Sequence, residues 1–109
     1  MCGRFTSTAT VDELMRRFGV TILQNLRPRW NVAPSQNSLV LVRDGLHLQA
    51  KTASWGLPPT GPNKSFLINA RMETAREKPT FRDAFSLSRC IVVASGWYEW
   101  SASKTPWHI

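Results

Sequence analysis

Long apolar runs and leader-like segments are missing from this sequence. No stretch approaches the ~18 apolar residues that a membrane-spanning helix needs. Met1 is followed by small and polar residues rather than by the apolar core of a secretory signal. Integral membrane and secreted proteins are therefore not predicted, and we expect a cytoplasmic one. Cysteine is scarce as well, and in that reducing compartment we expect Cys2 and Cys90 to be free thiols.

Cofactor motifs are missing too. The two histidines, His47 and His108, stand in no Cys–His spacing of a zinc site. The sequence also has no Gly-rich phosphate loop and no serine nucleophile elbow. His47 falls on the polar side of an expected strand and should be exposed. We predict no metal and no nucleotide cofactor.

Acidic residues are the last shortage. Seven Asp and Glu stand against fourteen Lys and Arg, most of them Arg, which gives a formal net charge of +7. An excess of this size favours polyanionic partners, and the planar guanidinium both matches phosphate and stacks on bases. Composition therefore favours a nucleic-acid partner, against the plainer interpretation that the charge serves solubility.

The residues that are present predict one α+β domain, mostly antiparallel β, with one clear helix near the N-terminus. The helix is expected over residues 10–19, where apolar residues recur at helical spacing. Thr10 and Glu13 form a capping box at its start, and Gly19 suits the C-terminal cap.

A β-hairpin is expected over residues 39–43 and 46–53, with its turn at Asp44-Gly45. Gly and Pro punctuate the rest of the chain. The remaining expectations are irregular chain over residues 27–29 and 33–35, a loop over 57–62, a short strand over 66–69, a short helix over 80–85, a buried strand over 90–94 that continues into 97–100, a turn over 101–104 and the opening of a strand at 107–109.

Position 2 is the first candidate for chemistry. A small residue after the initiator normally permits removal of Met1, which leaves Cys2 with a thiol and an α-amine on adjacent carbons. An α-amine has a reference pKa of about 7.7–8.0, so a useful fraction is neutral and nucleophilic at physiological pH. Such a 1,2-aminothiol condenses with an aldehyde to an imine and closes to a thiazolidine, which a mid-chain cysteine cannot do. The alternative is an incidental cysteine on a frayed terminus.

A polar triplet is the second candidate. An extended chain would place Asn69, Arg71 and Glu73 on one face. There they would form either a phosphate clamp with an orienting acid or a salt-bridged strand edge.

Aromatic residues form the third group. In residues 96–100, Glu99 would share one strand face with Trp97, and indoles around a carboxylate desolvate it and suit it to proton transfer. A Trp-rich core strand with Glu99 at its wet end is the alternative. Pro34 and Trp55 lie among basic loops, where such rings either stack on bases or belong to the core.

The order of these motifs is more specific than any one of them. The segments are residues 1–5, 30–34, 55–56, 68–74 and 96–100. In this order, over the whole chain, they closely resemble the SOS response-associated peptidase (SRAP) family. Its members resemble abasic-site processing proteins that shield single-stranded DNA.

The resemblance implies an α+β domain around an open, barrel-like β-structure with a basic groove for single-stranded DNA. The family's N-terminal cysteine, matched by Cys2, attacks the open-chain aldehyde of an abasic site and ends as a thiazolidine DNA–protein crosslink. Asn69 would hold this linkage, and Glu99 would handle protons during Schiff-base formation. The resemblance also implies a role in the SOS response, nucleoid association in a bacterium and a thiol autopeptidase activity of Cys2.

The resemblance assigns DNA contacts to six residues: Arg4, Asn31, Pro34, Trp55, Arg71 and Trp100. The two arginines would grip phosphates that flank the lesion. The tryptophans and the proline would pack on bases or on the duplex edge.

Length departs from the family. Family members are considerably longer, and a catalytic His followed by an acidic residue and Arg lies in their second half, a motif that His108 does not match. We therefore expect residues 1–109 to be the N-terminal half of a single SRAP domain. Half a barrel leaves open strand edges and an uncovered core face, so we expect self-association or complementation by the missing half. The alternatives are a non-covalent single-stranded DNA-binding module, a thiol peptidase acting on protein and an inactive fragment.

Overall fold

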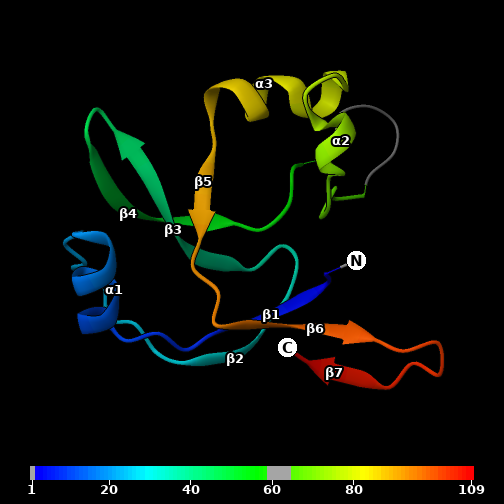
Figure 1. The fold of residues 1–109 in the computed structure, drawn as a ribbon, viewed down its shortest axis with the longest axis horizontal. Helices are drawn as coiled ribbons and strands as arrows, with labels where there is room; N and C mark the ends of the chain where they lie inside the picture. The colour runs from blue at the N-terminus through cyan, green and yellow to red at the C-terminus, as the bar shows by residue number, and fades with distance from the viewer. Residues whose placement is uncertain (1, 59–64) are drawn as a thin grey trace.

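Two antiparallel sheets frame the molecule (Figure 1). The computed structural model describes residues 2–58 and 65–109. The first sheet has the strand order β2-β1-β6-β7, with β1 at Arg4–Ser7, β2 at Arg29–Val32, β6 at Gly96–Trp100 and β7 at Pro106–His108. The second has the order β4-β3-β5, with β3 at Asn37–Asp44, β4 at His47–Ser54 and β5 at Cys90–Val92. The described strands close no barrel, and the predicted α+β class, open and mostly antiparallel, is confirmed.

The predicted N-terminal helix is confirmed as α1, Val11–Phe18. The Thr10 hydroxyl accepts a hydrogen bond from the Glu13 N–H at 3.3 Å, and the Thr10 N–H donates to the Glu13 carboxylate at 2.7 Å. The Thr10 hydroxyl also donates to this carboxylate, at 3.0 Å. The bond from the Thr10 N–H, and after it the bond from the hydroxyl, lower the pKa of the Glu13 carboxyl. Gly19 ends the helix at a φ of +63°, which favours glycine.

Strand β3 is the central strand of the second sheet, and residues on both of its faces are buried. On one face Leu39 and Leu41 join Leu14 of α1 in the main hydrophobic core. On the other face Ser38 and Val40 point toward a cavity described below. The second sheet therefore separates a packed core from a hollow.

The predicted hairpin forms, but its turn lies one residue further along than expected. Asp44 pairs with His47, which leaves Gly45 and Leu46 as the two turn residues. Gly45 has a φ of +59°, the conformation that a tight hairpin turn requires. Leu46 is 93% exposed, so the expected start of the second strand at this residue is wrong.

Two strands were not expected from the sequence. Residues 4–7 form β1 and residues 29–32 form β2, although Arg29 was assigned to irregular chain. Each has only four residues, and their pairing joins Phe5 to Val32 across a long stretch of chain. The local pattern of so short a strand carries little information, because its partners decide its state.

The expected strand over residues 66–69 is reduced to a single bridge between Leu57 and Leu67. Most of the loop expected over residues 57–62 lies outside the described residues. The extended stretch expected over residues 69–74 is also wrong, since Met72–Ala75 form the short helix α2. The predicted alternation therefore does not place Glu73 on a shared strand face with Asn69.

The expected buried strand over residues 90–94 is wrong in both burial and continuity. Strand β5 ends at Val92, and its three residues are exposed. Among the described strands β5 pairs with β3 alone, and its Cys90 and Val92 face the open cavity. Val93 alone is buried. The chain then leaves the second sheet and enters β6 of the first.

The remaining predictions near the C-terminus are confirmed. The expected helix over residues 80–85 lies within α3, Pro79–Leu87, which has its proline in the first turn. Residues 101–104 turn the chain between β6 and β7. Figure 1 shows α2 and α3 together on the side of the molecule opposite α1. Among the described residues, no helix is long and apolar enough to cross a membrane.

Gly96 leaves no room for a side chain, and this generates a prediction about stability. A Cβ at this position would lie 2.5 Å from the Ile109 carbonyl oxygen and 2.8 Å from the His108 ring. We expect Gly96→Ala to lower the free energy of unfolding by about 1–3 kcal/mol, because the β6–β7 pair must shift to admit the methyl group. Urea unfolding followed by circular dichroism measures this change.

Gly3→Ala is the matched control, because a Cβ at Gly3 would meet nothing within 4 Å. Equal stability losses for the two variants would contradict the role of Gly96.

Candidate functional site

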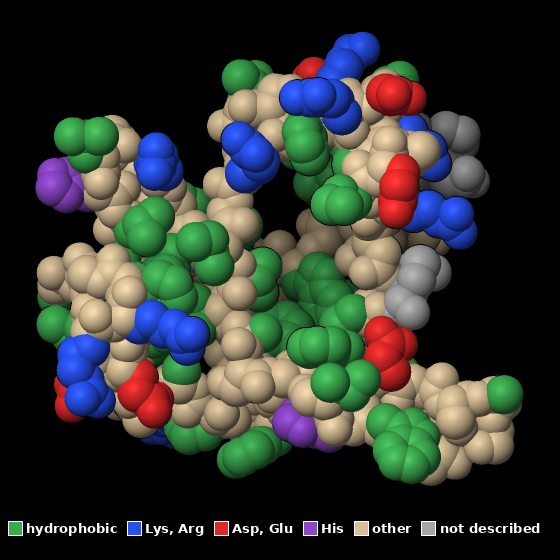
Figure 2. All heavy atoms as spheres, in the orientation of Figure 1, with side chains coloured by type: hydrophobic (Ala, Val, Ile, Leu, Met, Phe, Trp, Pro, Cys, Tyr) green, Lys and Arg blue, Asp and Glu red, His purple; other side chains and the backbone are tan. Residues whose placement is uncertain are grey.

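A cavity of about 640 Å³ opens between the two sheets and α3. Figure 2 shows the hollow, with hydrophobic side chains along its walls. The large apolar residues that line it are Phe5, Val40, Trp55, Leu57, Leu67, Ile68, Phe81, Phe85, Val92 and Trp97. Strands of both sheets and the helices α2 and α3 therefore contribute to a single, mainly apolar concavity.

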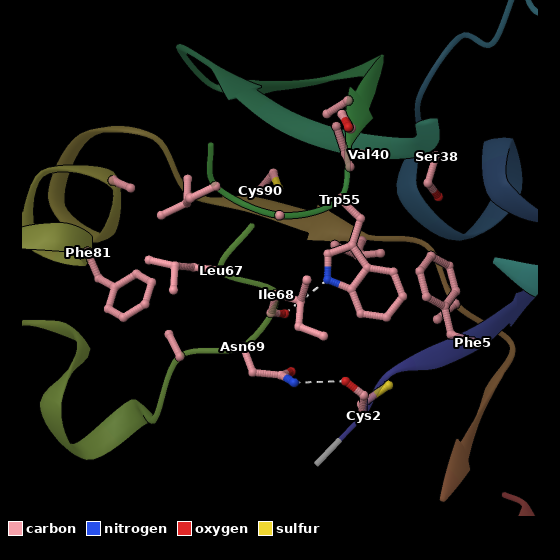
Figure 3. Close-up of a pocket in the computed structure, with 18 of the residues that line it drawn as sticks. Cys2, Phe5, Ser38, Val40, Trp55, Leu67, Ile68, Asn69, Phe81 and Cys90 are labelled. Atoms are coloured by element: carbon pink, nitrogen blue, oxygen red, sulfur yellow. Dashed lines mark hydrogen bonds between the residues drawn. The ribbon is translucent and has the colours of Figure 1, made fainter. Parts of the chain in front are cut away.

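Cys2 and Asn69, both predicted as catalytic, lie together in this cavity (Figure 3). The Asn69 side-chain amide donates a hydrogen bond to the Cys2 carbonyl oxygen at 3.0 Å, across 67 positions of sequence. The half-buried Cys2 thiol donates to the Arg4 carbonyl oxygen at 3.4 Å. One hydrogen bond thus holds the backbone carbonyl of the predicted nucleophile, and another holds its thiol.

Trp55 organises the segment that carries Asn69. Its indole N–H donates to the Ile68 carbonyl oxygen at 3.0 Å, and its ring packs against Phe5 with centroids 5.2 Å apart. Leu57 and Leu67 exchange two backbone hydrogen bonds beside it, at 3.0 and 3.1 Å. The predicted DNA-contacting Trp55 is therefore a half-buried wall residue with specific protein partners.

Glu99, the third predicted catalytic residue, lies on the cavity side of β6. It is half-buried and shares a strand face with Trp97, which lines the cavity, although Glu99 does not itself line it. Pairing runs from Phe5–Trp97 to Arg4–Tyr98, so the next step along β6 places Glu99 toward the end of β1 where Cys2 lies.

Arg4, Asn31 and Trp100 gather on the opposite face of the first sheet. The Arg4 guanidinium donates to the Asn31 side-chain oxygen at 2.9 Å. Arg4 pairs with Tyr98, whose ring lies 6.4 Å from that of Trp100. These three predicted DNA contacts form one surface group, in which Arg4 is half-buried and the other two are exposed, and the sheet separates it from the cavity.

The other two predicted DNA contacts stand apart. Pro34 is half-buried in the turn between β2 and β3, and Arg71 is exposed at the N-cap of α2. Among the described residues, neither side chain hydrogen-bonds to Cys2 or Asn69. The structure thus brings together Cys2, Asn69 and Trp55, and separately Arg4, Asn31 and Trp100.

Gln36 is a structural link that sequence reasoning missed. Its side-chain oxygen accepts hydrogen bonds from the Arg29 guanidinium at 2.6 Å and from the Ala33 N–H at 3.1 Å. Its backbone carbonyl accepts from the Trp55 N–H at 3.0 Å. The only sequence signal was its place just after the Ala33-Pro34-Ser35 turn, which names no partner.

The histidines and the second cysteine have separate surroundings. His47 is exposed, as expected. His108 packs its ring 5.0 Å from that of Tyr98 and lies 3.1 Å from the Thr6 hydroxyl, on the sheet face away from the cavity. Cys90 is a free, exposed thiol on the cavity wall remote from Cys2 (Figure 3). Within residues 2–58 and 65–109, no group of three or more His, Cys, Asp or Glu is arranged to hold a metal ion.

Comparison with known proteins identifies the family to which this chain belongs. The family model for SOS response associated peptidase (SRAP) matches residues 1–109. The chain belongs to the SRAP family. The resemblance carried by the five ordered segments is thereby confirmed for this SRAP-family chain.

Several curated relatives are similar to this SRAP-family chain. Abasic site processing protein YobE of Bacillus subtilis is 38% identical over 107 residues, which are 92% of this chain and 49% of that protein. Abasic site processing protein YoaM of the same organism is 38% identical over 120 residues, covering 100% of this chain and 53% of that protein. Abasic site processing protein YedK of Escherichia coli is 35% identical and is covered to 48%. The chain spans about half the length of the curated relatives it matches.

A solved structure supports the fold. The crystal structure of a protein from Bordetella bronchiseptica superposes with a TM-score of 0.69 at 22% identity, over 99% of this chain and 61% of that one. This likeness concerns the SRAP-type fold alone.

Proposed function

We propose that this SRAP-family chain processes abasic sites in single-stranded DNA by forming a covalent crosslink through Cys2. The observation that carries the proposal is the hydrogen bond from Asn69 to the Cys2 carbonyl oxygen, inside a mainly apolar cavity. It joins two motif residues that are far apart in sequence. The choice of an abasic site as the substrate comes from the relatives, which are named abasic site processing proteins.

The chemistry requires removal of Met1, which frees the α-amine of Cys2. This amine adds to the aldehyde carbon of the ring-opened abasic sugar, and loss of one water gives an imine. The Cys2 thiol then adds to the imine carbon while the nitrogen takes up a proton, which closes a thiazolidine. One aldehyde and one aminothiol thus give one thiazolidine and one water, with no oxidant or reductant.

Asn69 and Glu99 take separate roles in this proposal. Asn69 holds the Cys2 backbone, so that the amine and thiol stay on the same side of the incoming carbon. Glu99, on the cavity side of β6, accepts and returns the protons that imine formation and ring closure move.

DNA contacts divide between the two faces of the first sheet. Arg4, Asn31 and Trp100 offer a cation, an amide and an exposed indole on the outer face. Trp55 offers its ring from within the cavity, while Arg71 and Pro34 stand at the edges. A strand that touches both faces passes around the N-terminal end of β1, where Cys2 lies. This path would present a sugar to the thiol and its flanking phosphates to arginine.

The reaction needs a reduced thiol, so we place the protein in the cytoplasm, and in a bacterium at the nucleoid. A role in the SOS response and a thiol peptidase activity toward its own N-terminus are part of the same proposal, motivated by the family's description. Intact-mass analysis separates them, because retained Met1 removes the α-amine and leaves only a thiol.

We expect the 109-residue chain to form a denaturation-resistant crosslink with single-stranded DNA that carries one abasic site. Cys2→Ala should abolish it because both nucleophiles of the aminothiol are needed. Denaturing gels and intact mass provide the measurement, and the expected adduct equals protein without Met1 plus DNA minus one water.

Cys90→Ala is the matched control and should crosslink as the unsubstituted chain does, because this thiol has no neighbouring α-amine. An adduct that survives in Cys2→Ala would refute the proposal. Salt-sensitive binding with no adduct would favour the non-covalent DNA-binding module instead.

A second expectation concerns Glu99. Glu99→Gln keeps the shape of the side chain but removes the proton acceptor, so we expect the crosslinking rate at saturating DNA to fall by about 100-fold. Affinity for DNA containing a tetrahydrofuran analogue, which has no aldehyde, should stay unchanged. Glu77→Gln, on the exposed surface after α2, is the control. A change in affinity with an unchanged rate would remove Glu99 from proton transfer.

We also propose that the isolated chain self-associates. Large apolar side chains such as Leu87, Trp107 and Ile109 are 83%, 64% and 57% exposed, and β4, β5, β2 and β7 are the edge strands of their sheets. Sedimentation velocity should show an average mass that rises with concentration. A constant monomer mass across a wide concentration range would contradict this.

A further inference from the structure

Trp55 lines the cavity, and it also lies in the middle of a series of hydrogen bonds that ends at Cys2. We propose that Trp55, itself held by Gln36, is a positioning residue that sets the place of Asn69 and thereby of the Cys2 aminothiol. This inference rests on the proposed function for its catalytic consequence. It gives the indole N–H a task that DNA stacking does not require.

The chain of contacts begins at Gln36. Its side-chain oxygen joins the Arg29 guanidinium of β2 to the Ala33 N–H of the following turn. Its backbone carbonyl accepts from the Trp55 N–H, and the Trp55 carbonyl accepts from the Ser35 N–H at 2.8 Å. Both backbone polar groups of Trp55 are thus hydrogen-bonded to this turn, which fixes the position of its Cα and Cβ atoms.

The turn itself is fixed rather than adaptable. Ser35 has a φ of +68°, a left-handed conformation that a residue other than glycine adopts only when its surroundings hold it there. The Ser54 hydroxyl donates to the Ser35 carbonyl oxygen at 3.1 Å. Hydrogen bonds on both sides of Ser35 therefore define where Trp55 leaves β4.

The next contact is made by the indole. Its N–H donates to the Ile68 carbonyl oxygen, the backbone group that immediately precedes Asn69. Figure 3 shows this bond and, beside it, the bond from Asn69 to Cys2. The residue before Asn69 is thus held by Trp55, and Asn69 holds Cys2.

The Trp55 ring makes a second connection to the same point. It packs against Phe5 of β1, three positions after Cys2. Trp55 therefore contacts both segments whose meeting places Asn69 against Cys2. A shift of the indole would move these segments relative to one another.

The two roles of Trp55 are separable by substitution. Stacking on a base needs an aromatic ring, whereas positioning of Ile68 needs the N–H group as a donor. Trp55→Phe keeps an aromatic ring against Phe5 and leaves the half-buried Ile68 carbonyl without its partner. Positioning errors of about 1 Å cost reaction rate far more than binding.

The test is single-turnover crosslinking of the 109-residue chain with abasic single-stranded DNA over a range of DNA concentrations. We expect Trp55→Phe to lower the limiting rate by about tenfold and to leave the half-saturating DNA concentration within twofold of the unsubstituted value. Trp30→Phe is the control, since Trp30 is 64% exposed and its indole has no hydrogen bond within the described part of the chain. A weaker half-saturation with an unchanged limiting rate would assign Trp55 to DNA contact alone and overturn the proposal.

Gln36 supplies a second pair of variants. Gln36→Met removes the side-chain acceptor and should lower the limiting rate in the same direction as Trp55→Phe. Gln36→Glu keeps an oxygen for the Arg29 and Ala33 donors and should restore the limiting rate, even where its added charge weakens DNA binding. Equal limiting rates in both variants would exclude Gln36 from the positioning chain.

A readout without DNA separates this inference from the proposed function. In the ¹⁵N-labelled protein the Trp55 indole N–H should exchange with D₂O at least tenfold more slowly than that of Trp30, because only the former is hydrogen-bonded. The Asn69 side-chain amide signals should shift in Trp55→Phe and not in Trp30→Phe. Fast exchange at Trp55, or unmoved Asn69 signals, overturns the positioning role. An absent crosslink with these signals as expected would refute the proposed function alone.

Discussion

The connection between the two sheets determines where every other functional group lies. Residues 93–95 carry the chain from β5, paired with β3, to β6, paired with β1. The Val93 N–H donates to the Leu39 carbonyl oxygen and the Ser95 N–H to that of Thr6, so this short segment is bonded to both sheets. The distance between the sheets is thereby limited, and the space left between them becomes the cavity. Gly96 allows β7 to approach at the point where the segment ends.

Sequence reasoning succeeded where the determining contacts are local. The Thr10–Glu13 capping box and Gly19 fix α1 within one stretch of chain, and Gly45 fixes a hairpin to within one residue. It failed where partners are distant. Strand β1 exists because Phe5 meets both Val32 and Trp97, and the short length of that strand conceals this need. The apolar stretch at residues 90–92 looked buried, yet an edge strand beside a cavity leaves it exposed.

The site shows the same division. The order of the motifs identified Cys2 and Asn69, and the structure joins them by a hydrogen bond. The sequence could not reveal that the Trp55 indole is committed to Ile68, because the bond depends on how β4 leaves its sheet. It also assigned both Arg4 and Trp55 to DNA contact and could not show that the first sheet separates them. Residue type tells which interactions a side chain can make, while the fold determines on which side of the first sheet it makes them.

This separation explains why a protein with a net charge of +7 carries an apolar cavity beside its proposed nucleophile. The proposed phosphate recognition needs a cation that reaches solvent, and Arg4 lies on the sheet face away from the cavity. The proposed condensation of an amine with an aldehyde releases water, and apolar walls such as Phe5, Trp55 and Trp97 suit that step. The two requirements conflict on one surface, since guanidinium groups would bring water into the cavity. Distributing them over opposite faces of one sheet, with Cys2 at its end, satisfies both.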